Sequence, residues 1–215
     1  MLSFAEEIYL LALDDATGKI TSYSKEISVS YALVGAVLCE LSQLNKIDTD
    51  IDNLYVINKE PTGNKVLDEV LTTLSEPEEN MPVYYWLKIL LSEAEDAEKL
   101  ILSQLIEKGI LKQVDERVFW VFHSRSYPII DNQDILNVEV RLRELVLGND
   151  IPDPRDAIMI SLVLACNLFE NILSPKELRR AEKRIHSLAK LDLVGREVIE
   201  MIREIKDFNP NVFSN

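Results

Sequence analysis

The stretch from Asp156 to Leu173, DAIMISLVLACNLFENIL, is the feature that most constrains the fold. Its apolar residues fall on every side of a helical repeat, and a helix that is apolar all round is normally buried all round. Asp153 is placed to cap this helix, and Pro154 suits its first turn. A membrane span needs about 20 predominantly apolar residues, and polar residues interrupt this run at Ser161, Asn167, Glu170 and Asn171. We therefore predict a buried central helix.

Length and composition favour a single hydrophobic core. The chain has 215 residues, of which 47% are hydrophobic, which is enough for one substantial core. We expect a single helical domain over residues 1–207 and a frayed tail over residues 208–215. Cys39 and Cys166 both lie in apolar helical patterns, so we read them as small buried hydrophobic residues of a protein in a reducing compartment. The N-terminus has no secretion signal pattern, and a cytoplasmic location is expected.

Charge is distributed unevenly along the chain. The net charge is −14, and residues 1–100 hold 19 acidic residues against 7 basic ones. An acidic surface repels nucleic acid and anionic lipid at long range. Between Lys176 and Lys206 the balance is reversed, with 9 basic residues against 6 acidic ones. The residues that could face an anion therefore lie on one amphipathic helix of this region: Arg179, Arg180, Lys183 and Arg184.

The remaining pattern is typical of amphipathic helices packed around the central one. Ser3 followed by Glu6 resembles a helix N-terminal capping box, and the helix expected near residues 28–44 contains Gly35, which indicates close helix packing. A long helix is expected from about Val83 to Gly109. Residues 48–58 alternate weakly and predict at most a short strand or edge segment. The predicted fold class is therefore mainly α, with a central apolar helix, surrounding amphipathic helices and one short β-hairpin.

The expected hairpin follows Gly109 and runs from Leu111 to Phe122. Its second strand is predicted to start at Arg117 and contains an unbroken apolar run: Val118, Phe119, Trp120, Val121 and Phe122. An exposed strand of this kind would invite aggregation, so it must be covered by its own domain, another subunit or lipid. We predict that the hairpin is an association element; the alternative is that the run folds back onto the core of its own domain.

A helix, a glycine and a hairpin also occur in winged-helix DNA-binding domains. The would-be recognition helix is acidic, however, with few basic residues to oppose Glu93, Glu95, Asp96 and Glu98. Neutralising DNA phosphates requires lysine and arginine. We therefore expect no binding to nucleic acid.

The sequence also argues against an enzyme. Its two histidines, His123 and His186, lie in no metal-spaced cluster and beside no nucleophile motif. Carboxylate pairs such as Glu6-Glu7 occur, but an acidic chain contains such pairs by chance. We expect no catalytic residues, no metal site and no cofactor.

An ordered series of short motifs resembles the Golgi phosphoprotein 3 family, in particular its prokaryotic members. The resemblance runs over roughly residues 2–205, and no single motif is specific. The matching pieces are Glu6-Glu7-Ile8, Leu10 to Leu13, Asp15, Gly18, Gly35 to Leu41, Pro61-Thr62-Gly63, Leu67-Asp68-Glu69, Leu105 to Leu111, Tyr127-Pro128, Asp153, Arg155, Glu170-Asn171, Ala181 and Lys183-Arg184.

The resemblance implies a non-enzymatic, mostly helical domain whose hairpin serves self-association and membrane contact. Eukaryotic members resemble peripheral membrane adaptors that bind phosphatidylinositol 4-phosphate and the cytosolic tails of glycosyltransferases. The family's lipid pocket uses a tryptophan, which falls near Tyr23, and arginines, which fall at Val34, Glu95 and Glu98. Because bidentate arginine recognises a phosphate monoester, these replacements argue against lipid binding.

Two functional hypotheses follow, and the winged-helix regulator remains the less favoured third. The first is an adaptor at a membrane periphery or on a protein partner, with at most weak contact to an anionic lipid head group. The second is a lipid-independent scaffold that forms homo-oligomers through the hairpin. The protein partner is not identified by the sequence.

Overall fold

The computed structural model describes residues 2–14, 17–20, 22–50, 53–77, 79–92, 94–118 and 122–208. Helices dominate this part of the chain, so the predicted mainly-α fold class is confirmed. Two helices, α2 (Tyr23–Gln43) and α7 (Pro154–Ala165), pack against each other in the interior. The helices around them are α1 (Phe4–Ala12), α3 (Lys65–Ser75), α4 (Val83–Leu91), α5 (Ala94–Glu107), α6 (Gln133–Leu147), α8 (Phe169–Ile172), α9 (Pro175–Ala189) and α10 (Leu193–Phe208).

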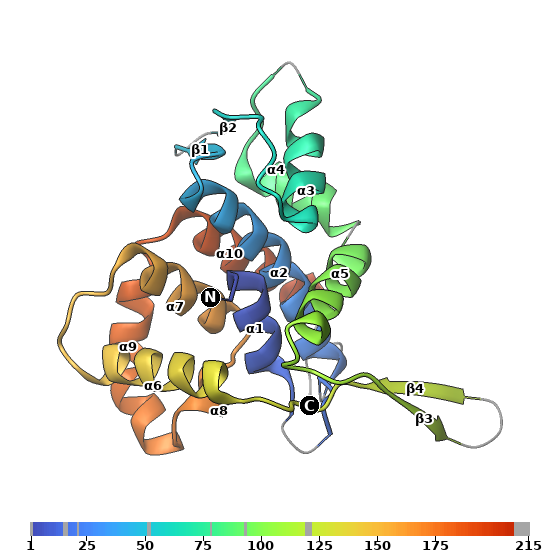
Figure 1. Ribbon diagram of the computed structural model, residues 1–215. Helices are drawn as coiled ribbons and strands as arrows, with labels where there is room; N and C mark the ends of the chain where they lie inside the picture. Colours follow the sequence, from blue (N-terminus) through green and yellow to red (C-terminus); the bar gives the residue numbers. More distant parts are fainter. Residues whose placement is uncertain are drawn as a thin grey trace.

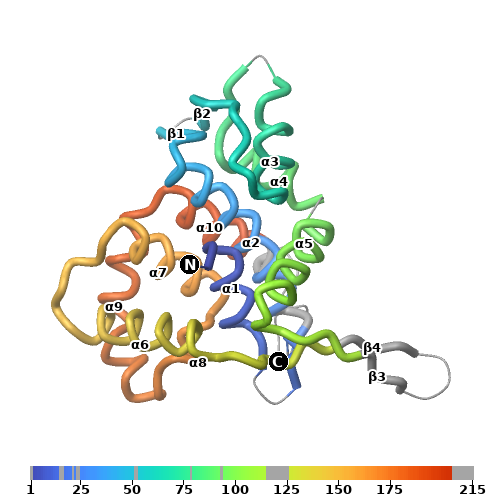
Figure 2. Tube along the Cα trace, in the orientation of Figure 1, coloured from blue at the N-terminus to red at the C-terminus, as the bar shows by residue number. Residues whose placement is uncertain are grey.

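Helix α2 is the element that most of the fold contacts. It packs against α1, α3, α4, α5, α7 and α10 (Figure 1). Figure 2 shows the first helix of the chain, α1, and the last, α10, both lying close to α2. A Cβ atom on Gly35 would lie 2.5 Å from Cγ2 of Val198, so the glycine lets α2 and α10 approach closely, as the sequence indicated.

The apolar stretch at Asp156–Leu173 is buried as predicted, but it is not one continuous helix. Helix α7 ends at Ala165, and Asn167 adopts the left-handed conformation with φ 58° before α8 begins. Asparagine tolerates this conformation because its short polar side chain bonds locally. The predicted start is confirmed: the Asp153 side chain accepts a 2.8 Å hydrogen bond from the Asp156 amide. The fold therefore has two central helices, α7 and the longer α2.

The capping box predicted at Ser3 is confirmed, and the structure adds a second one at Ser174. At α1, Ser3 and Glu6 each accept a hydrogen bond from the other's backbone amide. At α9, Ser174 and Glu177 do the same, with Pro175 in the first turn. Each box satisfies amides that the first helical turn leaves without partners.

The expected long helix from Val83 to Gly109 is wrong, because the structure holds two helices there. Helix α4 ends at Leu91, and α5 begins at Ala94. The Ser92 hydroxyl donates to the carbonyl of Ile89 at 2.7 Å, which closes the end of α4. A serine competes with the helix for backbone groups in this way, and the apolar periodicity on both sides of it concealed the break.

The strands form two antiparallel pairs. Strand β1 (Ile47–Thr49) pairs with β2 (Leu54–Val56), in the region where only a short strand or edge segment was expected. Strand β3 (Val114–Val118) pairs with β4 (Phe122–Ser126), and this hairpin extends away from the helices (Figure 1).

The position of the second hairpin differs from the prediction. Val114 pairs with Ser126, and Val118 pairs with Phe122, so the strands begin and end several residues later than expected. Val118 and Phe122, the two ends of the apolar run, therefore belong to different strands. A run of apolar residues without alternation does not fix strand register, which explains the error.

No helix in the described part of the chain is both long and apolar enough to cross a lipid bilayer.

Candidate functional site

A cavity with a largely polar lining lies between α1, α2 and α5. It has a volume of about 480 Å³, and three carboxylates, Glu26, Glu95 and Glu98, line it together with the aromatic side chains of Tyr9 and Tyr127. Among the described residues that line it, Lys19 is the only basic one. The structure thus places two of the pocket positions from the resemblance, Glu95 and Glu98, in one cavity. We call it the acidic pocket.

The Glu98 carboxylate is the most constrained group in the acidic pocket. Its Oε1 accepts a hydrogen bond from the Tyr9 hydroxyl at 3.1 Å, which joins α5 to α1. Burial raises the pKa of Glu98, although the Tyr9 hydrogen bond lowers it, and the nearby charges of Glu26 and Glu95 raise it further. Burial and the Glu98 charge likewise raise the pKa of Tyr9. The pocket therefore disfavours additional negative charge.

Gly18 builds one wall of the acidic pocket. Its φ of 61° is in the left-handed region, and a Cβ atom there would lie 2.5 Å from the backbone of Tyr127 and Pro128. The Tyr127 amide donates a 2.9 Å hydrogen bond to the Gly18 carbonyl. Only glycine fits this backbone conformation and this contact without strain. Two of the short sequence motifs, at Gly18 and at Tyr127-Pro128, are thereby brought together.

The structure does not bring Val34 to the acidic pocket. Val34 is buried on α2 and lines a separate cavity of about 250 Å³, whose walls include Val66 of α3 and Leu90 of α4. Tyr23 is the first residue of α2, and its side chain lies outside the described part of the structure. Of the positions named by the resemblance, Glu95 and Glu98 thus share one cavity and Val34 lines another.

The four basic residues of α9 have different surroundings. The Arg184 guanidinium donates hydrogen bonds to the carbonyl of Leu145, at 2.9 Å, and to that of Asp150. It therefore ties α9 to the end of α6 and the segment that follows. Arg180 and Lys183 are exposed, and Arg179 lines another cavity, described below.

The association hairpin is described only in part. Val118 and Phe122 form the last pair of the β3–β4 ladder. Phe119, Trp120 and Val121 lie outside the described residues, so the predicted association through them is neither confirmed nor contradicted by the structure.

A buried ionic network, which sequence reasoning missed, joins α1 to the helices around it. Glu6 and Glu7 are only 1% and 3% exposed, although we read this pair as a chance feature of an acidic chain. Lys108 Nζ lies 2.6 Å from Glu6 Oε1, and Arg155 Nη2 lies 2.9 Å from Glu7 Oε1. The available signal was the apolar neighbourhood: both glutamates stand inside a helix whose other residues are almost all hydrophobic.

Arg141 extends this network to α7. Its Nη2 lies 3.5 Å from Glu7 Oε2, and its Nε lies 2.8 Å from Asp156 Oδ1. Burial raises the pKa values of both Glu7 and Asp156, and the arginines offset part of this effect. Since buried carboxylates of α1 and α7 are paired with cations from other elements, the network serves to position helices.

No group of three or more His, Cys, Asp and Glu side chains within the described ranges is arranged to hold a metal ion. His186 lines the same cavity as Arg179, and the side chain of His123 lies outside the described part of the structure. The chemistry that the acidic pocket offers is therefore electrostatic: repulsion of anions and attraction of cations.

Comparison with known proteins agrees with the motif series. The family model for Golgi phosphoprotein 3 (GPP34) matches residues 4–205. The vacuolar protein sorting-associated protein 74 of Schizosaccharomyces pombe is 26% identical over 151 residues, which cover 60% of this chain and 44% of that protein. The match thus spans less than half the length of this relative. Because the family model covers almost the entire chain, the chain belongs to the Golgi phosphoprotein 3 family.

Proposed function

We propose that this chain is a non-enzymatic adaptor that contacts protein partners in the cytoplasm or at a membrane surface without recognising a phosphoinositide head group. The observation that supports this most is the acidic pocket, where Glu26, Glu95 and Glu98 stand together. A phosphate monoester placed there would be repelled by three carboxylates. It would also lose its hydration without gaining a bidentate contact to arginine. The family membership supports the adaptor role, and the pocket argues against the lipid ligand.

Contact with a membrane, where it occurs, is proposed to be electrostatic and weak. Arg180 and Lys183 are exposed on α9 and available to anionic lipid, whereas Arg184 is held by backbone carbonyls. A juxtamembrane basic residue contributes about 1 kcal/mol to binding an anionic surface. Such attraction depends on surface charge and does not select one head group.

Self-association through the β3–β4 hairpin is the second proposed property. The hairpin extends from the helical body, and Val118 and Phe122 form the last pair of its ladder (Figure 1). An apolar hairpin end that leaves the body needs another surface to cover it. The acidic charge of α5, which includes the exposed Glu95 and Asp96, disfavours the winged-helix alternative.

Vesicle co-sedimentation tests the lipid proposal. Phosphatidylcholine vesicles containing phosphatidylinositol 4-phosphate are compared with vesicles of equal surface charge made with phosphatidylserine. We expect the wild-type chain to show no preference between them. Replacing Glu95→Arg and Glu98→Arg together restores the two arginines that the family uses, and we expect this variant to favour the phosphoinositide.

A matched control separates a specific pocket effect from net charge. Glu60→Arg with Glu79→Arg makes the same change in charge at exposed positions outside the acidic pocket, and we expect it to bind both vesicles equally. A wild-type chain that selects phosphatidylinositol 4-phosphate, and keeps this selectivity after Arg180→Glu with Lys183→Glu, would overturn the proposal. Circular dichroism verifies that each variant is folded.

A further inference from the structure

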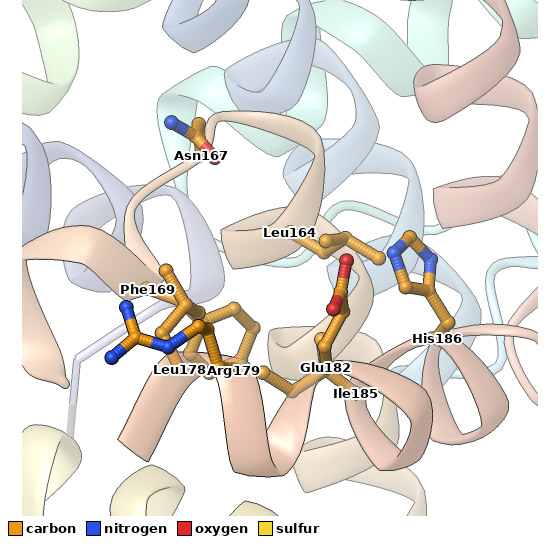
Figure 3. A pocket seen from close by; sticks show the side chains of 8 residues that line it. All are labelled: Leu164, Asn167, Phe169, Leu178, Arg179, Glu182, Ile185 and His186. Carbon is orange, nitrogen blue, oxygen red and sulfur yellow. The ribbon is translucent and has the colours of Figure 1, made fainter. Parts of the chain in front are cut away.

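A third cavity lies between the α7–α8 corner and α9. Its volume is about 220 Å³, and its floor is apolar (Figure 3). Phe169 and Ile185, at 2% and 1% exposure, form the covered base, while Leu164 and Leu178 are half-buried walls. We call it the α9 pocket.

The α9 pocket follows from the break in the apolar stretch. Because the chain turns at Asn167, with φ 58°, α8 does not continue the axis of α7 along α9. Leu164 and Leu178 both line the hollow beside this turn. Binding is favourable when an apolar ligand group displaces the water that contacts these apolar walls.

The size of the α9 pocket limits its ligand. Pockets for drug-sized molecules measure about 300–1,000 Å³, whereas an apolar cavity of about 150 Å³ accepts benzene. A hollow of about 220 Å³ thus suits a single aromatic ring or a branched alkyl group. A lipid chain or a large cofactor is too big to be enclosed.

Polar groups of both signs stand at the edge of the α9 pocket. Arg179, Glu182 and His186 follow one another at helical spacing on α9, and in Figure 3 the Glu182 and His186 side chains rise toward Leu164. The Arg179 guanidinium lies at the other end, where Phe169 and Leu178 are found (Figure 3). Within the described structure, no hydrogen bond or ion pair occupies these three side chains.

Two other charged residues of the same helix, Glu177 and Arg184, are engaged by the fold. Glu177 belongs to the capping box and pairs with Arg143, and Arg184 is bonded to two carbonyls. Arg179 and Glu182 thus stand about one helical turn apart along α9 at the pocket edge, and neither has a side-chain partner among the described residues. A ligand with only a negative charge would be repelled by Glu182, and a ligand with only a positive charge would be repelled by Arg179.

We propose that the α9 pocket binds a small zwitterion with one large apolar group, that is, a free apolar amino acid. The apolar side chain occupies the floor between Leu164 and Leu178. The ligand carboxylate pairs with Arg179, and its ammonium donates to Glu182. Opposite charges on the ligand thus match opposite charges at the pocket edge, and the ring or alkyl group matches the volume. This site is separate from the acidic pocket and goes beyond the adaptor role.

Titration with phenylalanine, followed in the two-dimensional ¹H–¹⁵N spectrum of the whole chain, tests the proposal. Three analogues each remove one feature: 3-phenylpropanoate lacks the ammonium, 2-phenylethylamine lacks the carboxylate, and alanine lacks the ring. We expect phenylalanine to move the amide signals of Leu164 and of residues 178–186. Each analogue should bind at least about tenfold more weakly, because it leaves a charge or the floor without a partner.

Two variants and two controls assign the contacts. Arg179→Gln and Glu182→Gln should each weaken phenylalanine binding about tenfold. Arg180→Gln, next to Arg179 but outside the pocket lining, and Glu170→Gln on α8 should leave it unchanged. Arg179 and Glu182 line the pocket, whereas Glu170 and Arg180 do not. All four side chains are exposed, so each variant is expected to fold.

Several results would overturn the proposal. Phenylalanine that moves none of these signals shows that the hollow binds no amino acid. Equal binding of phenylalanine, 3-phenylpropanoate and 2-phenylethylamine would show that the pocket recognises the apolar group alone. Binding that survives both Arg179→Gln and Glu182→Gln places the ligand elsewhere.

Discussion

Arg155 on α7 donates a 2.9 Å hydrogen bond to Glu7 on α1. The same guanidinium donates to the Leu2 carbonyl at 2.8 Å and lies over the Phe4 ring, 4.3 Å from its centroid. One side chain thus fastens the first helix of the chain to the interior by an ion pair, a backbone contact and a cation–π contact. Much of the arrangement around α1 depends on it.

Replacing Arg155→Met is expected to lower the free energy of unfolding by about 3–5 kcal/mol, because Glu7 would remain buried without its main partner. Urea denaturation followed by circular dichroism measures this. The control is Arg203→Met, which removes an exposed pair with Glu200 and should cost at most about 1 kcal/mol. Equal effects of the two substitutions would show that the buried pair stabilises no more than a surface one.

Gly195→Ala is expected to destabilise the chain by about 1–3 kcal/mol, despite the higher helix propensity of alanine. A Cβ atom there would lie 1.9 Å from Ser161 Oγ and 2.5 Å from Asp192 Oδ2. Ser161→Ala removes the nearest of these atoms, so the double variant should lose less than the sum of the two single losses. Additive losses, measured by thermal unfolding, would contradict the predicted clash.

Glu98→Gln is expected to raise the melting temperature at neutral pH. The ordinary pKa of this carboxyl is 4.5, and burial raises it in the folded state. The folded state therefore binds more protons than the unfolded state just above pH 4.5, so the stability from this group is present below that pH. It is lost as the pH rises through the folded pKa.

The advantage of Glu98→Gln should therefore shrink as the solution is acidified toward pH 4.5. The variant stays neutral at every pH and still offers an oxygen to the Tyr9 hydroxyl. Glu95→Gln removes a charge at an exposed neighbouring position and should have a smaller effect. Thermal melts over a pH series make the comparison, and a difference that does not change with pH would exclude this protonation linkage.

Phe119→Glu combined with Trp120→Glu tests association through the hairpin. We expect the helical circular dichroism signal to persist while the mass in sedimentation equilibrium falls. Tyr85→Glu with Ile89→Glu is the control, since these two apolar residues are exposed on α4 and receive the same charges. If the hairpin variant unfolds, its residues belong to the core and the association hypothesis loses its support.

Calorimetry of the monomeric chain is expected to show one unfolding transition. One hydrophobic cluster extends from α1 and α2 to α9 and α10, so these parts should lose their packing together. Two well-resolved transitions would show that residues 1–207 form more than one cooperative unit.

The sequence determined those features that depend on residues near one another along the chain. The capping box at Ser3 and the start of α7 at Asp153 were predicted correctly, because a cap and its partner amide lie within one turn. The burial of the Asp156–Leu173 stretch was also predictable, since apolar residues on all sides leave no face for water. The order of short motifs sufficed to indicate the family.

Tertiary structure alone decided which distant residues meet. Burial by the fold raises the pKa of Glu98, although the Tyr9 hydroxyl 3.1 Å away lowers it, and Val34 lines a different cavity because it lies on another stretch of α2. Glu7 and Arg155 are 148 positions apart, yet they form a buried pair. Neither hydrophobic periodicity nor a count of charges identifies such pairs, because a charged side chain is stable in the interior only where the fold places an opposite charge beside it.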